Sequence, residues 1–315
     1  MKVETKKLPK STLQLNITVP VNKVKEAYNE FIELSVKSVE IKGFRKGNAP
    51  RDLVEKSLDP AKVNGEVVNK LLEKYYIQAL KENKINPLSN PKVEIKKFGL
   101  EEDFEFVATV AVRPDVKIGD YKKVLKEKLD ERKKESEKLK ETALKKGDDI
   151  KNIHNHLHTN EIIKIIVDSA EIEVPELLIE DEVNRMRARL INQTETLNMT
   201  MEQYLLAQAK TSEQLNAEFE NNAKGSLKAE FALAQVVKDS GIEVSDEEIE
   251  ETAAASGDPV ALENLKDPVH KWYIKSILEK NKLLAGIMEE LEGNTKQEQK
   301  EKEVQNDKQN GKEKK

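Results

Sequence analysis

The chain has 315 residues, of which 36% are charged and only 4% are aromatic. Its hydrophobic content of 37% lies below the ~45–50% of typical globular domains, which favours an elongated, largely helical protein with thin cores. The absence of cysteine excludes disulfides and thiolate metal sites. The sequence shows neither a signal peptide nor an apolar run of the ~20 residues that cross a membrane, which predicts a cytoplasmic protein without a membrane partner.

The first region is predicted to be an α+β domain over residues 1–114. Residues 11–19 place Leu13, Leu15, Ile17 and Val19 at alternate positions, which is the period of a half-buried strand. The same reasoning predicts further strands at 3–8, 92–98 and 103–112, a helix from Asn22 to about Glu40, a loop at 41–51, and helices that follow Pro50 and Pro60.

The rest of the chain is predicted to be helical. Residues 115–160 are rich in Lys and Glu and are typical of a charged helical linker. Residues 161–292 have helical periodicity throughout, which predicts an elongated all-α domain after the α+β domain. Residues 293–315 are polar and are predicted to form a disordered tail. The helix boundaries expected in this part are capping boxes at Thr200–Gln203 and Ser245–Glu248, a stop at Gly241 and a start at Pro268.

The loop at 41–51 contains Gly43-Phe44-Arg45-Lys46-Gly47-Asn48-Ala49-Pro50-Arg51. Four basic residues and no acidic residue lie between Glu40 and Asp52. The two glycines permit tight turns that present Phe44, Arg45 and Lys46 together. Such a tip suits an RNA surface, where the charges meet phosphates and the ring stacks. The residues alone leave open that Phe44 folds back onto its own core and that the basic residues are merely solvated.

The loop pattern resembles the ribosome-docking signature of bacterial trigger factors, Gly-Phe-Arg-x-Gly-x-x-Pro at the tip of a helix-loop-helix. It stands here as Gly43, Phe44, Arg45, Gly47 and Pro50, with Lys46 as an additional cation. The segments at 17–20, 113–121 and 170–182 also resemble the start of that family, the exit from its first domain and the entry to its helical C-terminal domain. The resemblance covers residues 1–121 and about 161–292.

The resemblance implies a ribosome-associated chaperone that works without ATP. Its partners would be the large ribosomal subunit near the tunnel exit, through both protein and rRNA, and nascent or unfolded polypeptides. The chain has no Walker-type nucleotide motif, and we predict no cofactor. Whether the free protein forms a homodimer is left open.

Full-length members of this family carry an FKBP-like prolyl isomerase between the two regions. Residues 115–160 contain one aromatic residue, Tyr121, and fall below the about 50 residues of a small domain. A pocket for a proline ring needs an apolar, aromatic lining, which Lys and Glu do not provide. We therefore predict no isomerase domain, no catalytic residues and no enzyme.

The resemblance also implies that the helical region forms an open cradle. Its lining is expected to mix apolar with polar side chains, and such a lining binds many sequences weakly. An ordinary place in the interhelical core is the more frequent alternative for each candidate. The candidates are Met186, Leu190, Met199, Met201, Tyr204, Leu205, Phe219 and Phe231.

His154, His156 and His158 alternate along the linker and would share one face of a strand. Such a cluster can bind a metal, but a solvated linker is the favoured interpretation, and we predict no metal site.

Two other functions also stay open for the whole chain. One is a prolyl isomerase with an unrecognised active site, and the other is a ribosome-binding regulatory protein without chaperone activity.

Overall fold

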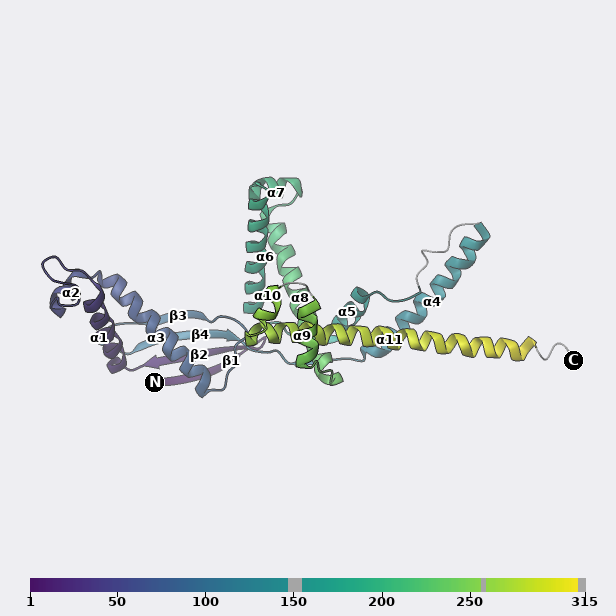
Figure 1. Ribbon diagram of the computed structural model, residues 1–315, viewed down its shortest axis with the longest axis horizontal. Helices are drawn as coiled ribbons and strands as arrows, with labels where there is room; N and C mark the ends of the chain where they lie inside the picture. Colours follow the sequence, from purple (N-terminus) through teal and green to yellow (C-terminus); the bar gives the residue numbers. More distant parts are fainter. Residues whose placement is uncertain (147–154, 256–258, 311–315) are drawn as a thin grey trace. The chain divides into compact units, whose positions relative to one another are not determined.

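The structure, a computed structural model, describes residues 1–146, 155–255 and 259–310 (Figure 1). The chain divides into two compact units. Unit 1 comprises residues 1–115 and 173–223, and unit 2 comprises residues 116–172 and 224–315. The helical residues 161–292 thus contribute to both units, and the domain boundaries at 114, 160 and 292 stay a prediction.

Unit 1 begins with the expected α+β region. Its sheet is antiparallel, with the order β1 (Lys2–Leu8), β2 (Thr12–Val19), β4 (Phe104–Ala111) and β3 (Lys92–Lys97). Leu15 pairs with Ala108 and Ile17 with Phe106, so the apolar residues of the two central strands share one face. Helices α1 (Val21–Ser38) and α3 (Pro60–Glu82) supply the other buried residues of this core. The alternating pattern thus predicted these strands.

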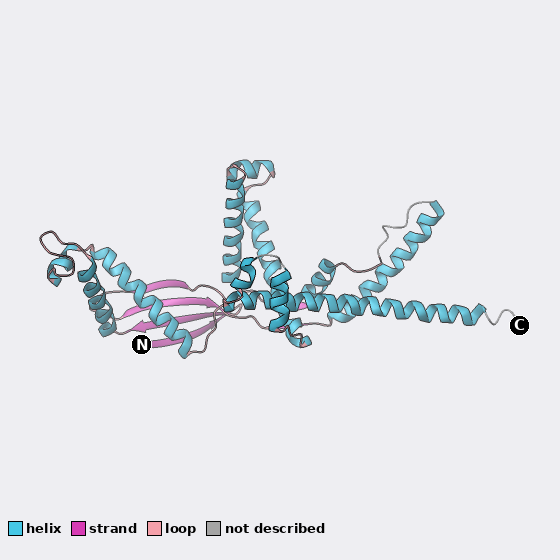
Figure 2. Cartoon of the chain, viewed as in Figure 1, coloured by secondary structure: helices cyan, strands magenta, loops and turns pink. Residues whose placement is uncertain are grey.

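The second part of unit 1 is a helical arm. Helix α6 (Glu176–Thr196) and the first part of α8 (Ser212–Ser240) run side by side and are joined at one end by α7 (Met201–Ala207) (Figures 1 and 2). Arg187 of α6 donates to Oδ1 of Asn216 on α8 at 3.0 Å. The expected capping box is confirmed, because Thr200 Oγ1 accepts the Gln203 N–H at 3.2 Å and Gln203 Oε1 accepts the Thr200 N–H at 2.9 Å.

Unit 2 contains a short two-stranded ribbon that periodicity did not predict. Strand β5 (Val116–Ile118) pairs with β6 (Ala170–Ile172) in antiparallel register. The expectation that residues 161–292 are helical throughout is therefore wrong at β6. Strands of three residues are too short to display an alternation that could be recognised in the sequence. The chain leaves through β5 and returns through β6, and Gly119 closes the ribbon by donating its N–H to Ser169 O at 2.8 Å.

The segment expected to be a charged linker contributes to the core of unit 2. Helix α4 (Tyr121–Lys146) buries Leu125 and Leu129, and α5 (Thr159–Asp168) buries Ile162 and Ile166. The same cluster contains Ala232, Leu233 and Val236 of α8 and Leu283 and Ile287 of α11 (Pro268–Asn310). The first half of α4 is therefore part of the hydrophobic core of unit 2, although most of its surface is charged.

The last helix extends beyond its expected end. A disordered tail was predicted from residue 293, whereas α11 continues to Asn310. Gln, Lys and Glu are good helix formers, and no proline interrupts them. Each residue added to an existing helix gains a hydrogen bond without a new nucleation step. Residues 311–315 lie outside the described residues.

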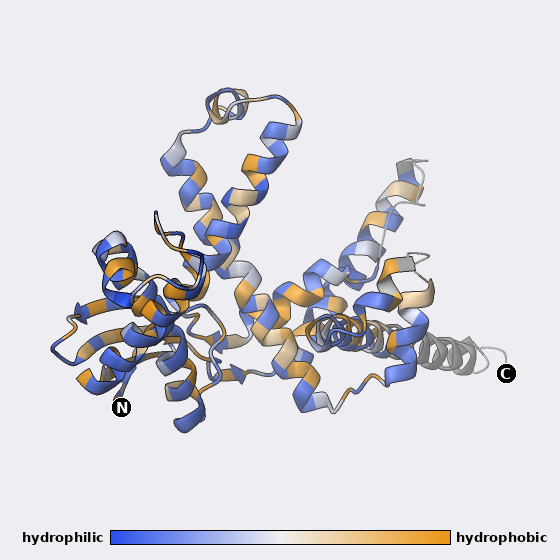
Figure 3. Ribbon diagram, turned by 60° about the vertical axis from the view of Figure 1, so that its left-hand side comes forward, coloured by the Kyte–Doolittle hydropathy of each residue, from blue (hydrophilic) through white to orange (hydrophobic). Residues whose placement is uncertain are grey.

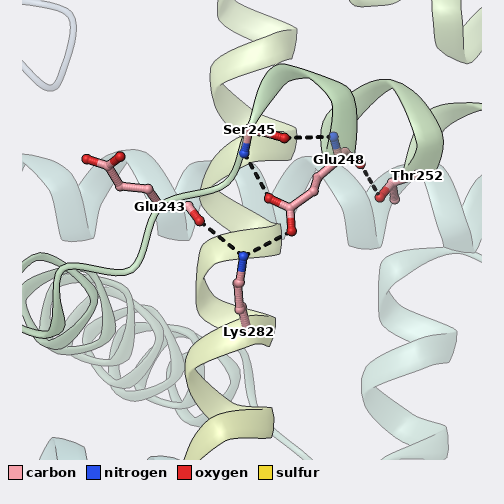
Figure 4. Close-up of polar contacts among 5 residues, drawn as sticks. All are labelled: Glu243, Ser245, Glu248, Thr252 and Lys282. Atoms are coloured by element: carbon pink, nitrogen blue, oxygen red, sulfur yellow. Dashed lines mark hydrogen bonds and ion pairs between the residues drawn. The ribbon is translucent and has the colours of Figure 1, made fainter.

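Helix α9 (Asp246–Ala255) is fastened to α11 by a small polar network (Figure 4). Ser245 Oγ accepts the Glu248 N–H at 3.2 Å and Glu248 Oε2 accepts the Ser245 N–H at 2.9 Å, which confirms the second capping box. Lys282 Nζ of α11 donates to Glu248 Oε1 at 2.9 Å and to Glu243 O at 3.2 Å. The Ser245 N–H, and after it the Lys282 ammonium, hold the pKa of Glu248 below its usual value. Helix α10 (Pro259–Asn264) lies between α9 and α11 in the chain.

Alanine substitutions at two glycines are expected to change the stability in opposite directions. A Cβ at Gly119 would lie 2.9 Å from Ser169 O, whereas a Cβ at Gly225, inside α8, would meet no atom within 4 Å. We expect Gly119→Ala to destabilise unit 2, because backbone must move to remove the clash. We expect Gly225→Ala to stabilise α8 by roughly 0.5–1 kcal/mol, because alanine loses less backbone entropy in a helix. Urea unfolding of both variants measures the two changes in the free energy of unfolding, and changes of the same sign would contradict the prediction.

The network around Glu248 makes a prediction about pH. The pKa of Glu248 is lower in the folded state than in the unfolded state. The ionised carboxylate therefore stabilises the folded protein fully above the unfolded-state pKa of about 4.3, and this stabilisation is lost as the pH falls through the folded-state pKa. We expect Lys282→Met to lower the protection factors of the α9 amides at neutral pH. The further loss of protection towards about pH 3 should then be smaller than in the wild type. Lys128→Met is the control, because Lys128 pairs with Glu131 on its own helix, α4.

Candidate docking loop and polypeptide-binding arm

The loop between α1 and α2 (Arg51–Ser57) is built from two consecutive tight turns. Phe44 N–H donates to Ile41 O at 3.0 Å, and Asn48 N–H donates to Arg45 O at 2.9 Å. Gly43 and Gly47 occupy the third position of their turns, with φ of +93° and +88°. That is the backbone of a type II turn, which favours glycine at this position. The spacing of the two glycines therefore leaves Phe44 and Arg45 at the junction between the turns.

The side chains of this loop face solvent. Phe44 is 42% exposed, and residues 42–48 are all exposed. The interpretation in which Phe44 is buried in its own core is therefore wrong. Among the residues that the structure describes, Lys42, Arg45 and Lys46 form no ion pair. Ala49 is buried, and Pro50, which follows it, is the N-cap of α2. The loop thus combines three free cations and one exposed ring on a defined backbone.

Two hydrogen bonds hold the base of the loop. Arg51 Nη2 donates to Asn29 Oδ1 of α1 at 2.5 Å. The Tyr28 hydroxyl, also on α1, donates to Glu55 Oε1 at 2.6 Å, and this bond raises the pKa of Tyr28. Val54 of α2 is buried. Helix α2 is therefore fixed against α1 by packing and by polar bonds.

The structure places the eight cradle candidates in two classes. Leu190 and Phe231 are buried, and Phe231 lies in unit 2, whereas the other seven belong to unit 1. Burial makes these two residues part of the helix packing. The remaining six are half-buried, namely Met186, Met199, Met201, Tyr204, Leu205 and Phe219. Their role in a cradle stays a prediction.

Sequence reasoning missed the most exposed apolar residues. On the arm, Leu197 is 63% and Leu206 is 80% exposed, and Ile191 is also exposed. In unit 2, Trp272 of α11 is 66% exposed, with Val269 and Tyr273 exposed beside it in the sequence. Figure 3 shows hydrophobic residues intermixed with hydrophilic ones along α6, α7 and α8. Helix α7 has no buried residue, so neither Leu205 nor Leu206 is part of a core.

The histidines provide no metal site in the described part of the chain. His154 lies outside the described residues. His156 and His158 stack edge to face with ring centroids 5.1 Å apart, and no group of metal-binding side chains occurs among the described residues. His158 is the N-cap of α5, and Glu161 Oε2 accepts its N–H at 2.9 Å.

Two family models match the sequence. One, the bacterial trigger factor protein (TF), covers residues 1–146, and the other, the bacterial trigger factor protein (TF) C-terminus, covers residues 119–289. The chain belongs to the bacterial trigger factor family. The two matches overlap, so they leave no residues between them for the middle prolyl-isomerase domain of full-length trigger factors.

Individual relatives agree with this assignment. The trigger factor of Staphylococcus epidermidis is 39% identical over 108 residues, which are 34% of this chain and 25% of the relative. That of Desulforamulus reducens is 37% identical over 122 residues, which are 39% of this chain and 28% of the relative. The chain thus spans about a quarter of the length of the curated relatives that it matches.

A solved structure shares the fold. It is described as "Promiscuous Substrate Recognition in Folding and Assembly Activities of the Trigger Factor Chaperone". The TM-score is 0.61 at 16% identity, and the alignment covers 92% of this chain and all of the other. Within the described residues, no helix is both long and apolar enough to cross a bilayer.

Proposed function

We propose that this trigger factor is an ATP-independent, ribosome-associated chaperone of the cytoplasm that binds nascent or unfolded polypeptides. The observation that carries the proposal is the loop at 41–50, whose turns expose Phe44, Arg45 and Lys46 together. Membership of the family supports it, because the loop contains the family's docking signature. The partner at this loop is the large ribosomal subunit near the tunnel exit.

The chemistry of the loop suits a surface of RNA and protein. Free cations release counterions from phosphates when they bind, which gives an affinity that depends steeply on salt. The exposed ring of Phe44 can stack on an unpaired base or fill an apolar niche. The two turns fix the backbone in advance, so that little conformational entropy is lost on docking.

The helices supply a holding surface on which exposed apolar residues alternate with polar ones. Leu197 and Leu206 are exposed on the arm and Trp272 on α11, and Asn198, Gln203 and Lys271 lie near them in the sequence. Scattered apolar contacts bind many unfolded segments weakly, because no single deep pocket selects one of them. Weak binding allows release without a nucleotide cycle.

We propose in addition that the chain has little or no prolyl isomerase activity. In the described residues between β5 and β6, the chain forms the helices α4 and α5 and no sheet with an aromatic pocket. No observation favours the regulatory alternative, since docking alone would not require exposed apolar residues on the helices. A proline-limited refolding reaction should therefore proceed at its uncatalysed rate, and acceleration would contradict this part of the proposal.

The docking assignment predicts the behaviour of a loop variant. Replacing Phe44, Arg45 and Lys46 together by Ala should weaken binding to purified ribosomes by about a hundredfold or more, since it removes two cations and one stacking ring. Co-sedimentation over a range of salt concentrations measures the loss. The same variant should still suppress aggregation of an unfolded client. Normal co-sedimentation of the variant would show that the loop does not dock.

The holding surface predicts the converse result. Leu197→Ser combined with Leu206→Ser should raise the amount of protein needed to suppress client aggregation by about threefold or more, because two apolar contacts are lost. Ribosome binding should not change. Ile77→Ser is a matched control, since Ile77 is an exposed apolar residue of α3, outside the arm. Equal effects of the control and the double variant would remove the arm from the proposal.

A further inference from the structure

The four cations of the loop sequence are not equivalent. The side chains of Lys42, Arg45 and Lys46 have no polar partner among the residues that the structure describes. Arg51 differs, because its guanidinium donates to Asn29 Oδ1 on α1 at 2.5 Å. It is also the first residue of α2, beyond the two turns. Arg51 therefore directs its charge back to α1, away from the tip of the loop.

A second bond links the same two helices one turn further on. Glu55 lies four residues after Arg51 on α2 and accepts the hydroxyl of Tyr28 at 2.6 Å. Tyr28 and Asn29 are consecutive on α1. The four residues thus form two adjacent cross-links, which we call the α1–α2 clamp. Val54 lies between Arg51 and Glu55 in the sequence, and its side chain is buried.

The clamp closes the loop at its base. Helix α1 ends at Ser38 and α2 begins at Arg51, so every loop residue lies between two helices whose mutual position the clamp restrains. Within the loop, the hydrogen bonds of the two turns are local and do not reach α1 or α2. The turns determine the shape of the tip, but its direction depends on how α2 is held against α1.

We propose that the α1–α2 clamp positions the docking loop, and that Arg51 acts as a positioning residue and not as a contact to the ribosome. The inference rests on the proposed docking function. A free α2 would let the tip sample many orientations, and ordering it on binding would weaken the affinity. The clamp removes that cost before docking, and it does so without adding a charge to the interface.

Salt dependence separates positioning from contact. A cation that meets a phosphate contributes about one unit to the slope of log affinity against log salt, and its removal lowers the slope by that amount. A cation that only holds the loop contributes to affinity but not to the slope. Loss of one clamp bond should weaken ribosome binding roughly three- to tenfold, which is the range of a single hydrogen bond.

The test compares three charge-removing substitutions of the full chain with one that is neutral. Lys46→Met removes a tip cation, Arg51→Met removes the clamp cation, and Lys56→Met is the control, because Lys56 lies on α2 with no ion pair in the described part of the chain. Tyr28→Phe removes only the clamp hydroxyl. Ribosome co-sedimentation gives affinity and salt slope, and hydrogen exchange of the free protein reports the amides of Phe44 and Asn48.

We expect Lys46→Met to reduce the slope by about one, whereas Arg51→Met and Tyr28→Phe weaken binding with the wild-type slope. The two clamp substitutions should combine less than additively, because they act through one arrangement. Both should speed exchange at the Phe44 and Asn48 amides, and Lys56→Met should change neither exchange nor ribosome binding.

A salt slope reduced by Arg51→Met would overturn the positioning role of the clamp. Unchanged loop exchange and unchanged affinity in Tyr28→Phe would also overturn it. If the wild type fails to co-sediment, the docking function is wrong, and the exchange rates alone still decide whether the clamp orders the loop.

Discussion

The presentation of the loop depends on a backbone conformation at two positions. Gly43 and Gly47 adopt φ near +90°, where a side chain would be strained. Neither position is short of space, since a Cβ would meet no atom within 4 Å. The requirement for glycine is therefore one of torsion angle and not of packing. Because the two turns follow each other directly, Phe44 and Arg45 are left on an exposed backbone that cannot easily collapse onto the domain.

The missing middle domain is replaced by more than a spacer. Where full-length trigger factors carry an isomerase, this chain has α4 and α5, which leave and return through the β5–β6 ribbon. Leu125 and Leu129 of α4 are buried with Ile162 and Ile166 of α5 in the core of unit 2. The apolar stripe is narrow, so the composition of α4 resembles a solvated linker. Its burial gives unit 2 a core that a flexible connector would not supply.

Sequence reasoning was strongest where a local rule determines the structure. The alternation of Leu15 and Ile17 predicted β2, and the Ser-x-x-Glu pattern predicted the capping box at Ser245. The loop signature identified a tip that the structure shows to be exposed. Contacts between residues far apart in the sequence could not be predicted, because no local pattern relates Lys10 to Glu176 or Arg51 to Asn29. Leu190 and Phe231 are buried, which is the more frequent alternative for such residues, although helical spacing alone cannot tell a core stripe from a binding surface.

The two proposed activities make opposite demands on the protein, and the chain assigns them to different elements. In the proposed docking, a small tip on a defined backbone supplies the charges. Holding uses exposed residues such as Leu206 in unit 1 and Trp272 in unit 2, which lie in separate units. An unfolded client is flexible enough to engage both without a defined geometry between them. In this proposal each contact is weak and opens quickly, and a client released at one site can stay bound at the other. A folding segment that buries its own apolar residues loses these contacts one by one, so that release follows from folding itself.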